Sequence, residues 1–390
     1  MRNNQMIPKI ELLDFNNFGM SGKSWFAPHV TPLPDGRWMG TMVTVSGSDF
    51  YGEPMFCFSA DEGRSWSTPE PIPPFRAKKL PGTEIMDAVG EGCPFTSPVD
   101  GTVFAFGCTV YYSQKGNVVW DKDVDQFSLP RELGVYASWG PETGWSERKV
   151  LPLPSAKMSY RTSATQLAFT PDGKCLVPIY LAVKRGMWGP HPSDIYGVTA
   201  PLYKQNGDIF ELVSEGRVYT IDKSRGFMEP SAVRLADGSY AMTIRAEDDN
   251  MYVATSPDGV TWDDVRPWRW DDGTPLVTHT TQQHWVRIGD RTFLLFTMKT
   301  TENEHIFRFR APLFIAEAIP QKALLIHDTL RTVFDRQQQN GIEALYGNFH
   351  CTQLDDNTAV VTDAALFLTP NADIGEHFAS TTIMAARITA

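Results

Sequence analysis

Short runs in which apolar and polar residues alternate are the dominant pattern along this chain. The clearest are Ser231–Leu235 and Tyr240–Ile244, which flank the turn residues Ala236–Ser239. Alternation with a period of two predicts β-strands, and the Asp-Gly pair between the runs predicts a tight hairpin. A third run, Met251–Thr255, leads into a turn that ends at Trp262. The pattern therefore predicts three antiparallel strands and a tryptophan packed between strands.

Turns of this kind recur along the whole chain, and their first aspartates are 53 to 72 residues apart: Asp35, Asp100, Asp172, Asp237, Asp290 and Asp355. Repeats of this length, each with strands around its turn, are typical of β-propellers. We predict an all-β fold, a six-bladed β-propeller forming a single domain over residues 1–390. The expected blades are 25–75, 85–152, 158–222, 227–270, 278–325 and 343–388. The run Ile10–Phe15 is expected to pair in the last blade, because closure removes exposed sheet edges.

Three segments share Ser, Gly and Trp at similar spacing. Ser59–Trp66 reads SADEGRSW, Ser256–Trp262 is one residue shorter, and Ser138–Trp145 lacks the Asp. These segments resemble the Asp-box (BNR) repeats of the sialidase, or neuraminidase, superfamily. The succession of Glu229, an Asp-Gly turn and Arg245 also resembles the middle of bacterial sialidases. An Asp box indicates a fold and not an activity, since its Asp caps backbone amides and its Trp fills a gap between strands.

Composition and charge limit the partners of the chain. A formal net charge of -11 argues against nucleic acid, which requires a positive footprint. No stretch reaches the roughly 18 apolar residues of a membrane span. The first residues, MRNNQMIPKIELLDF, lack the apolar region of a signal peptide. We expect a carbohydrate partner and a cytoplasmic location for the chain as given, or a secreted or periplasmic one if a signal was removed. The oligomeric state stays open.

The five cysteines show neither CxxC nor Cys/His spacing: Cys57, Cys93, Cys108, Cys175 and Cys351. Such scattered thiols indicate neither a disulfide framework nor a zinc site. We expect them to be isolated buried thiols. The sequence predicts no metal and no cofactor.

The resemblance implies catalytic roles for three residues. Sialidases use a Tyr nucleophile polarised by a Glu, together with an Asp acid/base, and a neutral phenol suits an anionic sugar that would repel a carboxylate. On this resemblance Tyr346 is the nucleophile, Glu229 polarises it, and Asp49 is the acid/base. Tyr346 is offset by about one residue from the family's position, so a core Tyr is the alternative. For Asp49 the alternative is the cap of a Gly/Ser-rich turn.

Sialidases also hold the substrate carboxylate with three arginines. Arg245 matches one of them, and Arg308 and Arg310 are candidates for another. In an extended strand these two side chains point to opposite faces, so only one lines the funnel, and we favour Arg310. At the remaining position stands Phe26. Because a third of the clamp is then missing, we expect ordinary sialic acid to be a poor ligand, with His29 as a possible replacement contact.

Histidines and a tryptophan complete the candidates for substrate binding. His29, His284 and His350 lie near the starts of expected innermost strands, where a propeller funnel is lined. Trp188 lies in an insertion, Lys184–Tyr196, that looks too long for a simple hairpin turn. An indole there is a candidate platform for the apolar face of a sugar ring.

The favoured function is an exo-acting, sialidase-like glycoside hydrolase that removes a terminal and anionic sugar. Two other classes stay open. Propeller relatives of similar appearance include polysaccharide lyases, which use His and Tyr as base and acid beside an Arg, so a lyase acting on uronate-containing glycans is one alternative. The other is a non-catalytic carbohydrate-binding propeller, because Asp boxes report only the fold.

Overall fold

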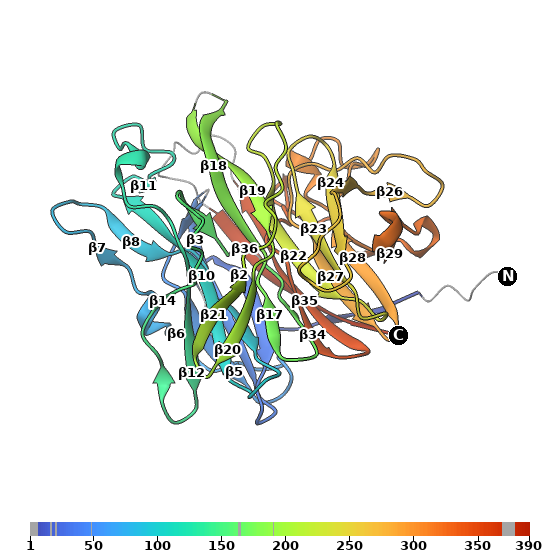
Figure 1. Cartoon of the computed structure of the whole chain (residues 1–390), viewed down its shortest axis with the longest axis horizontal. Helices are drawn as coiled ribbons and strands as arrows, with labels where there is room; N and C mark the ends of the chain where they lie inside the picture. Colours follow the sequence, from blue (N-terminus) through green and yellow to red (C-terminus); the bar gives the residue numbers. More distant parts are fainter. Residues whose placement is uncertain are drawn as a thin grey trace.

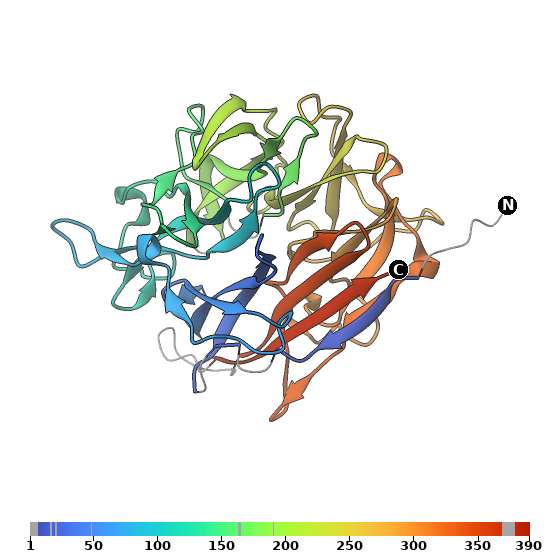
Figure 2. The ribbon, with the colours of Figure 1, turned by 90° about the horizontal axis from the view of Figure 1, so that it is seen from below.

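The computed structural model describes residues 7–15, 18–19, 22–47, 49–162, 165–189, 191–368 and 379–390. Within these ranges the chain consists of β-strands and five short 3₁₀ helices: η1 (Pro73–Phe75), η2 (Gln126–Ser128), η3 (Phe307–Phe309), η4 (Pro320–Lys322) and η5 (His327–Thr329). None of the helices in this part of the chain has the length and apolar character needed to span a membrane. Antiparallel sheets follow one another around a common centre in sequence order (Figure 2).

The first half of the chain forms four sheets. The first contains β2 (Trp25–Pro32), β3 (Trp38–Gly47), β4 (Phe50–Tyr51), β5 (Met55–Ser59) and β6 (Glu70–Pro71). The second contains β7 (Lys78–Lys79), β8 (Met86–Val89), β9 (Cys93–Thr96), β10 (Val103–Ser113), β11 (Gly116–Asn117), β12 (Gly134–Gly140), β13 (Gly144–Trp145) and β14 (Lys149–Val150). Next come β15 (Tyr160–Arg161), β18 (Ile179–Trp188) and β19 (His191–Thr199), and beside them β16 (Ala168–Phe169), β17 (Lys174–Leu176), β20 (Leu202–Asn206) and β21 (Ile209–Ser214).

The second half forms three larger sheets and a short hairpin. One sheet contains β22 (Met228–Arg234), β23 (Tyr240–Arg245), β24 (Met251–Ser256) and β25 (Arg266–Pro267). The next contains β26 (Arg269–Trp270), β27 (His284–Ile288), β28 (Arg291–Phe296), β29 (Leu313–Ile319), β30 (Leu324–Leu325) and β31 (Arg331–Phe334). The hairpin is β32 (Gln338–Gln339) with β33 (Ile342–Glu343), and the last sheet is β34 (His350–Asp355), β35 (Thr358–Leu368), β36 (Ala379–Thr389) and β1 (Lys9–Leu13).

The first strand pairs with the last. Residues of β1 lie opposite β36 from Lys9 with Thr389 to Leu13 with Ala385, and Figure 2 shows the blue strand beside the red sheet. The prediction that the N-terminal strand joins the last sheet is therefore confirmed, although β1 ends at Leu13 and not at Phe15. This pairing covers one edge of β36, whose other edge is held by β35.

The apolar core is a series of clusters between consecutive sheets. Met39 and Phe56 pack with Val103 and Ala105, for example, and the same kind of cluster joins each later pair of sheets. A further cluster joins the last sheet to the first, where Val360 lies with Trp25, Trp38 and Met42. Each sheet thus buries both faces against its neighbours, which explains why strands such as β10 and β23 are buried throughout or nearly so.

Two turns that the sequence analysis singled out share one hydrogen-bond pattern. In the first, Ser59 Oγ donates to Asp61 at 2.8 Å, and Trp66 Nε1 donates to the Gly63 carbonyl at 2.9 Å. In the second, Ser256 and Trp262 make the corresponding bonds to Asp258 and Gly259 at 3.1 Å. Both indoles are buried. Trp145, which follows a turn without an Asp, is only half-buried, and its ring packs edge-on against Phe56 with the centroids 5.4 Å apart.

Two predicted boundaries also differ from the structure. The expected fifth unit, 278–325, extends in the structure to β26 and β31, because Arg269 and Trp270 pair with β30 instead of joining the preceding sheet. The insertion expected at Lys184–Tyr196 is the tip of the long β18–β19 hairpin, in which Trp188 lies opposite His191 (Figure 1). The backbone pairing of β18 with β19 continues to this tip, where Met187 lies opposite Pro192.

We expect Trp262→Ala to lower the free energy of unfolding by about 3–5 kcal/mol, because a buried indole and its packing contacts are removed. Urea denaturation of both proteins measures the difference. Trp145→Ala is the matched control. Because this ring is half-exposed, its removal should lower the free energy of unfolding clearly less. A loss of less than about 1 kcal/mol for Trp262→Ala would contradict the role assigned to this indole.

Candidate functional site

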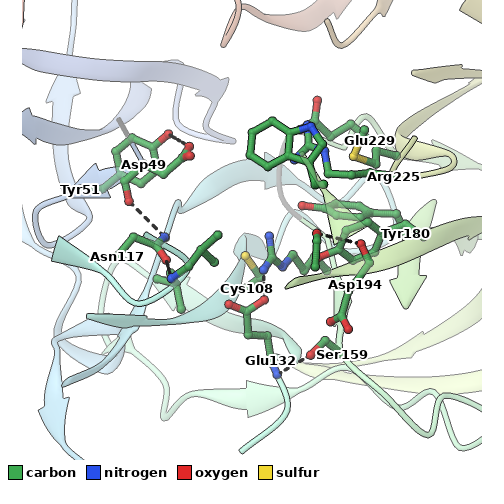
Figure 3. A pocket seen from close by; sticks show the side chains of 18 of the residues that line it. Asp49, Tyr51, Cys108, Asn117, Glu132, Ser159, Tyr180, Asp194, Arg225 and Glu229 are labelled. Carbon is green, nitrogen blue, oxygen red and sulfur yellow. Dashed lines mark hydrogen bonds and ion pairs between the residues drawn. The ribbon is translucent and has the colours of Figure 1, made fainter. Parts of the chain in front are cut away.

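A cavity of about 510 Å³ opens where loops and strand ends of several sheets meet. In the view of Figure 3, Asp49, Tyr51 and Asn117 lie on one side, Arg225, Glu229 and Tyr180 on the other, and Glu132 and Ser159 below them. The lining residues come from the first two sheets, from the sheet of β15, β18 and β19, from β22 and β23, from β35, and from the segments around η3 and before β34. Residues far apart in the sequence thus share one cavity, whose size is typical of small-molecule sites.

One wall of the cavity carries four guanidinium groups: Arg225, Arg245, Arg308 and Arg310. Two of them have carboxylate partners. Arg245 Nη1 donates to Glu229 Oε2 at 2.6 Å, and Arg225 binds Glu247. No carboxylate of the described residues forms an ion pair with Arg308 or Arg310. This wall therefore holds more positive charge than its own acids neutralise.

The pKa values of these arginines follow from their partners. Burial alone lowers the pKa of Arg245, but the Glu229 carboxylate more than offsets this, so the pKa is raised. Burial and the neighbouring guanidiniums lower the pKa of Arg308 to about 9 and that of Arg310 to about 10. Burial raises the pKa of Asp363, and the nearby Arg310 guanidinium and backbone amides act in the opposite direction. Neither Arg308 nor Arg310 has an ion-pair partner among the described residues, so a bound anion would supply a counter-charge.

Backbone contacts fix the position of Arg310. Its carbonyl accepts from the Tyr346 amide at 2.6 Å, and a Cβ on Gly347 would lie 2.8 Å from Arg310 Nη1. Only glycine leaves room for this guanidinium. Thr280 connects it to Arg245, because its hydroxyl accepts from Arg245 Nε at 2.6 Å while its carbonyl lies 3.5 Å from Arg310 Nη2.

Similar bulges aim two of the strands that border the cavity. Ala27 has φ 47° and Glu229 has φ 41°, each is followed by a proline, and the strand register shifts at both places. A bulge re-aims the side chain at its position. On β22 that side chain is Glu229, which the bulge leaves within hydrogen-bond distance of Arg245 on the adjacent strand. A non-glycine residue with positive φ is strained and persists where the surroundings hold it.

The opposite side of the cavity combines one carboxylate with an aromatic surface. The Tyr51 hydroxyl lies 3.3 Å from Asp49 Oδ1, and the Phe26 ring stacks on the Tyr51 ring at 5.7 Å. Asp49 is exposed and has φ 55°, and its carbonyl accepts from Asn117. Burial, followed by the neighbouring Asp49 carboxylate, raises the pKa of Tyr51 well above its usual range. The hydroxyl is thus a donor that orients Asp49.

A second charged group in the cavity was missed by the sequence analysis. Arg161 binds the Glu132 carboxylate, and Asp194, whose pKa is raised by burial, lies near them. Burial by itself lowers the pKa of Arg161, but the Glu132 carboxylate raises it, and the net pKa lies well above the usual range. Arg161 starts the third expected unit, in β15, so the rule that flagged His29 and Glu229 at strand starts would have identified it. Glu132 and Asp194 lie in segments with no recognisable motif.

Several expected site residues lie outside the cavity lining. Tyr346 is fully buried and its hydroxyl donates to the Asp335 carbonyl at 2.6 Å, so it occupies the core position that was the alternative. His29, His284 and His350 are also buried, and their rings form a row, with centroids 4.5 Å apart for His29 and His350 and 5.2 Å for His284 and His350. The inward-facing histidine side chains of β2, β27 and β34 pack against one another and are not part of the cavity lining.

The segment with Arg308 and Arg310 is not the extended strand that was expected. Residues Phe307–Phe309 form η3, with φ 57° at Arg308, and β29 starts only at Leu313. Both arginines therefore line the cavity, and the expectation that only one can do so is wrong. Trp188 lines it as well, but the Arg225 guanidinium lies 4.2 Å from the centre of its ring. Its role in stacking on a sugar stays a proposal.

Comparisons with known proteins support the fold. No protein-family model matches the sequence, and no curated protein matches it either. Among solved structures, a protein of unknown function from Dyadobacter fermentans is similar over 98% of both chains, with a TM-score of 0.64 and 13% identity. The Hadza microbial sialidase Hz136 is similar over 92% of this chain and 65% of its own, with a TM-score of 0.61 and 14% identity. Trypanosoma rangeli sialidase is similar over 98% of this chain and 60% of its own, with a TM-score of 0.60 and 11% identity.

These similarities show a sialidase-like fold and nothing finer, because identities of 11 to 14% carry no information about activity. The chain spans 60 to 65% of the length of the two sialidases. The candidate site therefore has to be judged from its own geometry.

We expect Arg308→Gln to leave the free energy of unfolding within about 1 kcal/mol of the wild type, or to raise it, because an unneutralised charge is removed. The same change should weaken the binding of a carboxylate ligand by about tenfold or more. Arg161→Gln is the matched control, since it strips Glu132 of its partner and should destabilise the fold. Denaturation and calorimetric titration measure both quantities. A strongly destabilised Arg308→Gln protein would show that this arginine serves the fold.

Proposed function

We propose that this chain is an exo-acting glycoside hydrolase of sialidase-like fold that removes a terminal, anionic sugar from a glycan. The observation that supports the proposal is the pair Arg308 and Arg310, which form no ion pair with a carboxylate of the described residues and lie in a cavity that Asp49 also lines. A carboxylate bound there gains charge-assisted hydrogen bonds and supplies the missing counter-charge. The sialidase-like fold of the chain supports a carbohydrate ligand.

We also propose that the sheets are the six blades of a propeller, with the two sheets of residues 160–214 as one blade. The series of apolar clusters between consecutive sheets, closed by the cluster of Val360 with Trp25, supports this architecture. The cavity would then occupy the funnel at the axis of the ring. Loops from different blades meet at such a funnel, which accounts for lining residues so far apart in the sequence.

In the proposed reaction Asp49 protonates the leaving oxygen of the glycosidic bond. Glu229, on the opposite wall of the cavity, accepts the proton of the attacking phenol. Tyr346 does not reach the cavity, so it is not carried forward as the nucleophile. We propose that Tyr180 supplies the phenol instead. It lines the wall of Glu229 (Figure 3), and like Glu229 it raises the pKa of Arg245. Attack by this oxygen on the anomeric carbon, with its proton passing to Glu229, would break the bond to the leaving group.

One alternative function has an observation in its favour. Because the expected nucleophile Tyr346 is buried in the core, a non-catalytic carbohydrate-binding protein would retain the arginine wall and need no chemistry. The lyase alternative has lost its main support, since His29, His284 and His350 do not line the cavity. Turnover measurements separate these possibilities.

We expect the wild-type chain to hydrolyse a chromogenic glycoside of an acidic sugar, such as a uronoside, and to turn over a simple sialoside poorly. On the family resemblance, Phe26 takes the position of the third clamp arginine, and an imperfectly paired carboxylate loses affinity. Asp49→Asn should lower turnover by about 10²–10⁴-fold with the fold unchanged. Tyr180→Phe should be similarly impaired.

Asp290→Asn is the control, because this exposed carboxylate lies in the turn between β27 and β28, outside the cavity lining. Absorbance of an unsaturated product would instead identify a lyase. Saturable binding of an acidic glycan with no turnover of any substrate would favour the binding protein, and efficient cleavage of neutral glycosides alone would refute the anionic specificity.

A further inference from the structure

Three side chains that ligate metals meet beside the cavity, in the part of the chain that the structure describes. They are His29 from β2, Glu91 from the segment before β9, and Cys93 at the start of β9. All three are buried, with exposed fractions of 3%, 8% and 6%. One ligand atom from each lies within 4.8 Å of the other two. Imidazole, carboxylate and thiolate are the ligand types that bind zinc in proteins.

The distances fit a tetrahedral metal centre. Cys93 Sγ lies 3.6 Å from His29 Nε2 and 3.9 Å from Glu91 Oε2. With Zn–S of about 2.3 Å and Zn–N or Zn–O of about 2.0–2.2 Å, tetrahedral angles place neighbouring ligand atoms about 3.4–3.7 Å apart. Both distances match this geometry to within a few tenths of an ångström. The ligand atoms of His29 and Glu91 lie within 4.8 Å of each other, so an ion held by all three would draw this pair to within about 3.3–3.6 Å.

Hydrogen bonds account for part of the arrangement. The Cys93 thiol donates to Glu91 Oε2, and the Nε2-protonated tautomer of His29 donates to Cys93 Sγ. His29 Nδ1 is buried without a hydrogen-bond partner. A divalent ion bound to one thiolate, one carboxylate and one neutral imidazole forms a group with no net charge. Such a group is far cheaper to bury than an isolated ion.

The fold brings these residues together through backbone geometry. The bulge at Ala27 shifts the register of β2 between Phe26 and His29. The Phe26 side chain lines the cavity while His29 packs inward against Cys93. The Thr41 hydroxyl donates to the Gly92 carbonyl at 2.6 Å, which ties the Glu91–Cys93 segment to the first sheet. His29 and Cys93 are therefore held on strands, and Glu91 lies in the short segment that joins β8 to β9.

We propose that His29, Glu91 and Cys93 form a binding site for zinc or a similar divalent transition metal. Three protein ligands leave a fourth position, and water reaches it from the cavity, because Glu91 lines the cavity wall. The residues that bind metal are distinct from the arginines and Asp49 of the proposed sugar site. The two proposals can therefore succeed or fail separately.

The test uses the untagged, full-length chain after treatment with a chelator. Cobalt(II) is added as the probe, because a cobalt–thiolate bond gives a charge-transfer absorption in the near ultraviolet and tetrahedral cobalt gives intense visible bands. We expect saturation at one equivalent, displacement by zinc, and a higher thermal midpoint with zinc bound. Cys93→Ser should abolish the charge-transfer band, and His29→Gln and Glu91→Gln should each weaken binding by more than the about 10–100-fold typical of outer contacts.

Cys175→Ser is the matched control, since this thiol is buried in another sheet and has no such neighbours. It should bind cobalt like the wild type. Circular dichroism shows which variants fold, and any one folded ligand variant suffices for the comparison. The proposal is overturned if the wild type binds no stoichiometric cobalt, or if a folded ligand variant binds it as tightly and with the same spectrum.

Discussion

The pairing of the first strand with the last is the interaction on which this arrangement depends. Five residues of β1 lie opposite residues 385–389 of β36, so the two ends of the chain share one sheet. That sheet packs against both of its neighbours through clusters that include Val360 on one side and Val361 on the other. Every sheet is thereby held between two others, and the strand ends that carry the cavity residues are positioned from all sides.

Positive charge at one wall of the cavity is the second constraint. Arg245 and Arg225 form ion pairs with Glu229 and Glu247, whereas no carboxylate in the described part of the chain forms one with Arg308 or Arg310. Burial, followed by the neighbouring guanidiniums, lowers the pKa of these two arginines to about 9 and about 10. A protein tolerates the cost of burying such charges where a ligand offsets it, which is how functional sites commonly trade stability for binding. The same physics explains why Arg161, paired with Glu132, is a structural residue.

Local patterns in the sequence predicted much of the fold. The strands Tyr240–Arg245 and Met251–Ser256 follow from alternation and turn residues, which act over a few positions. Asp49, Glu229, Arg245 and Arg310, which were chosen on a family resemblance, all line one cavity. Their roles in catalysis and binding stay predictions.

The rest depended on contacts that sequence spacing does not reveal. Tyr346 was assigned to the site on a one-residue offset, but it lies between β33 and β34, and its hydroxyl donates to the Asp335 carbonyl in the core. Arg308 was assigned to a strand because no residue in this segment predicts the positive φ that Arg308 adopts in η3. His29 lies more than 60 residues from Cys93, so a search for metal-ligand spacing could not join them. Long-range geometry alone brings these groups together.

The central claim is that the arginine wall selects an anionic sugar, and paired glycan arrays test it most directly. One array carries acidic glycans and their neutral counterparts, and the other carries the same glycans after methyl esterification of every carboxyl group. The account predicts binding of wild-type chain to a subset of acidic glycans on the first array and loss of that binding on the second. Binding that survives esterification, or that is confined to neutral glycans, would contradict the account.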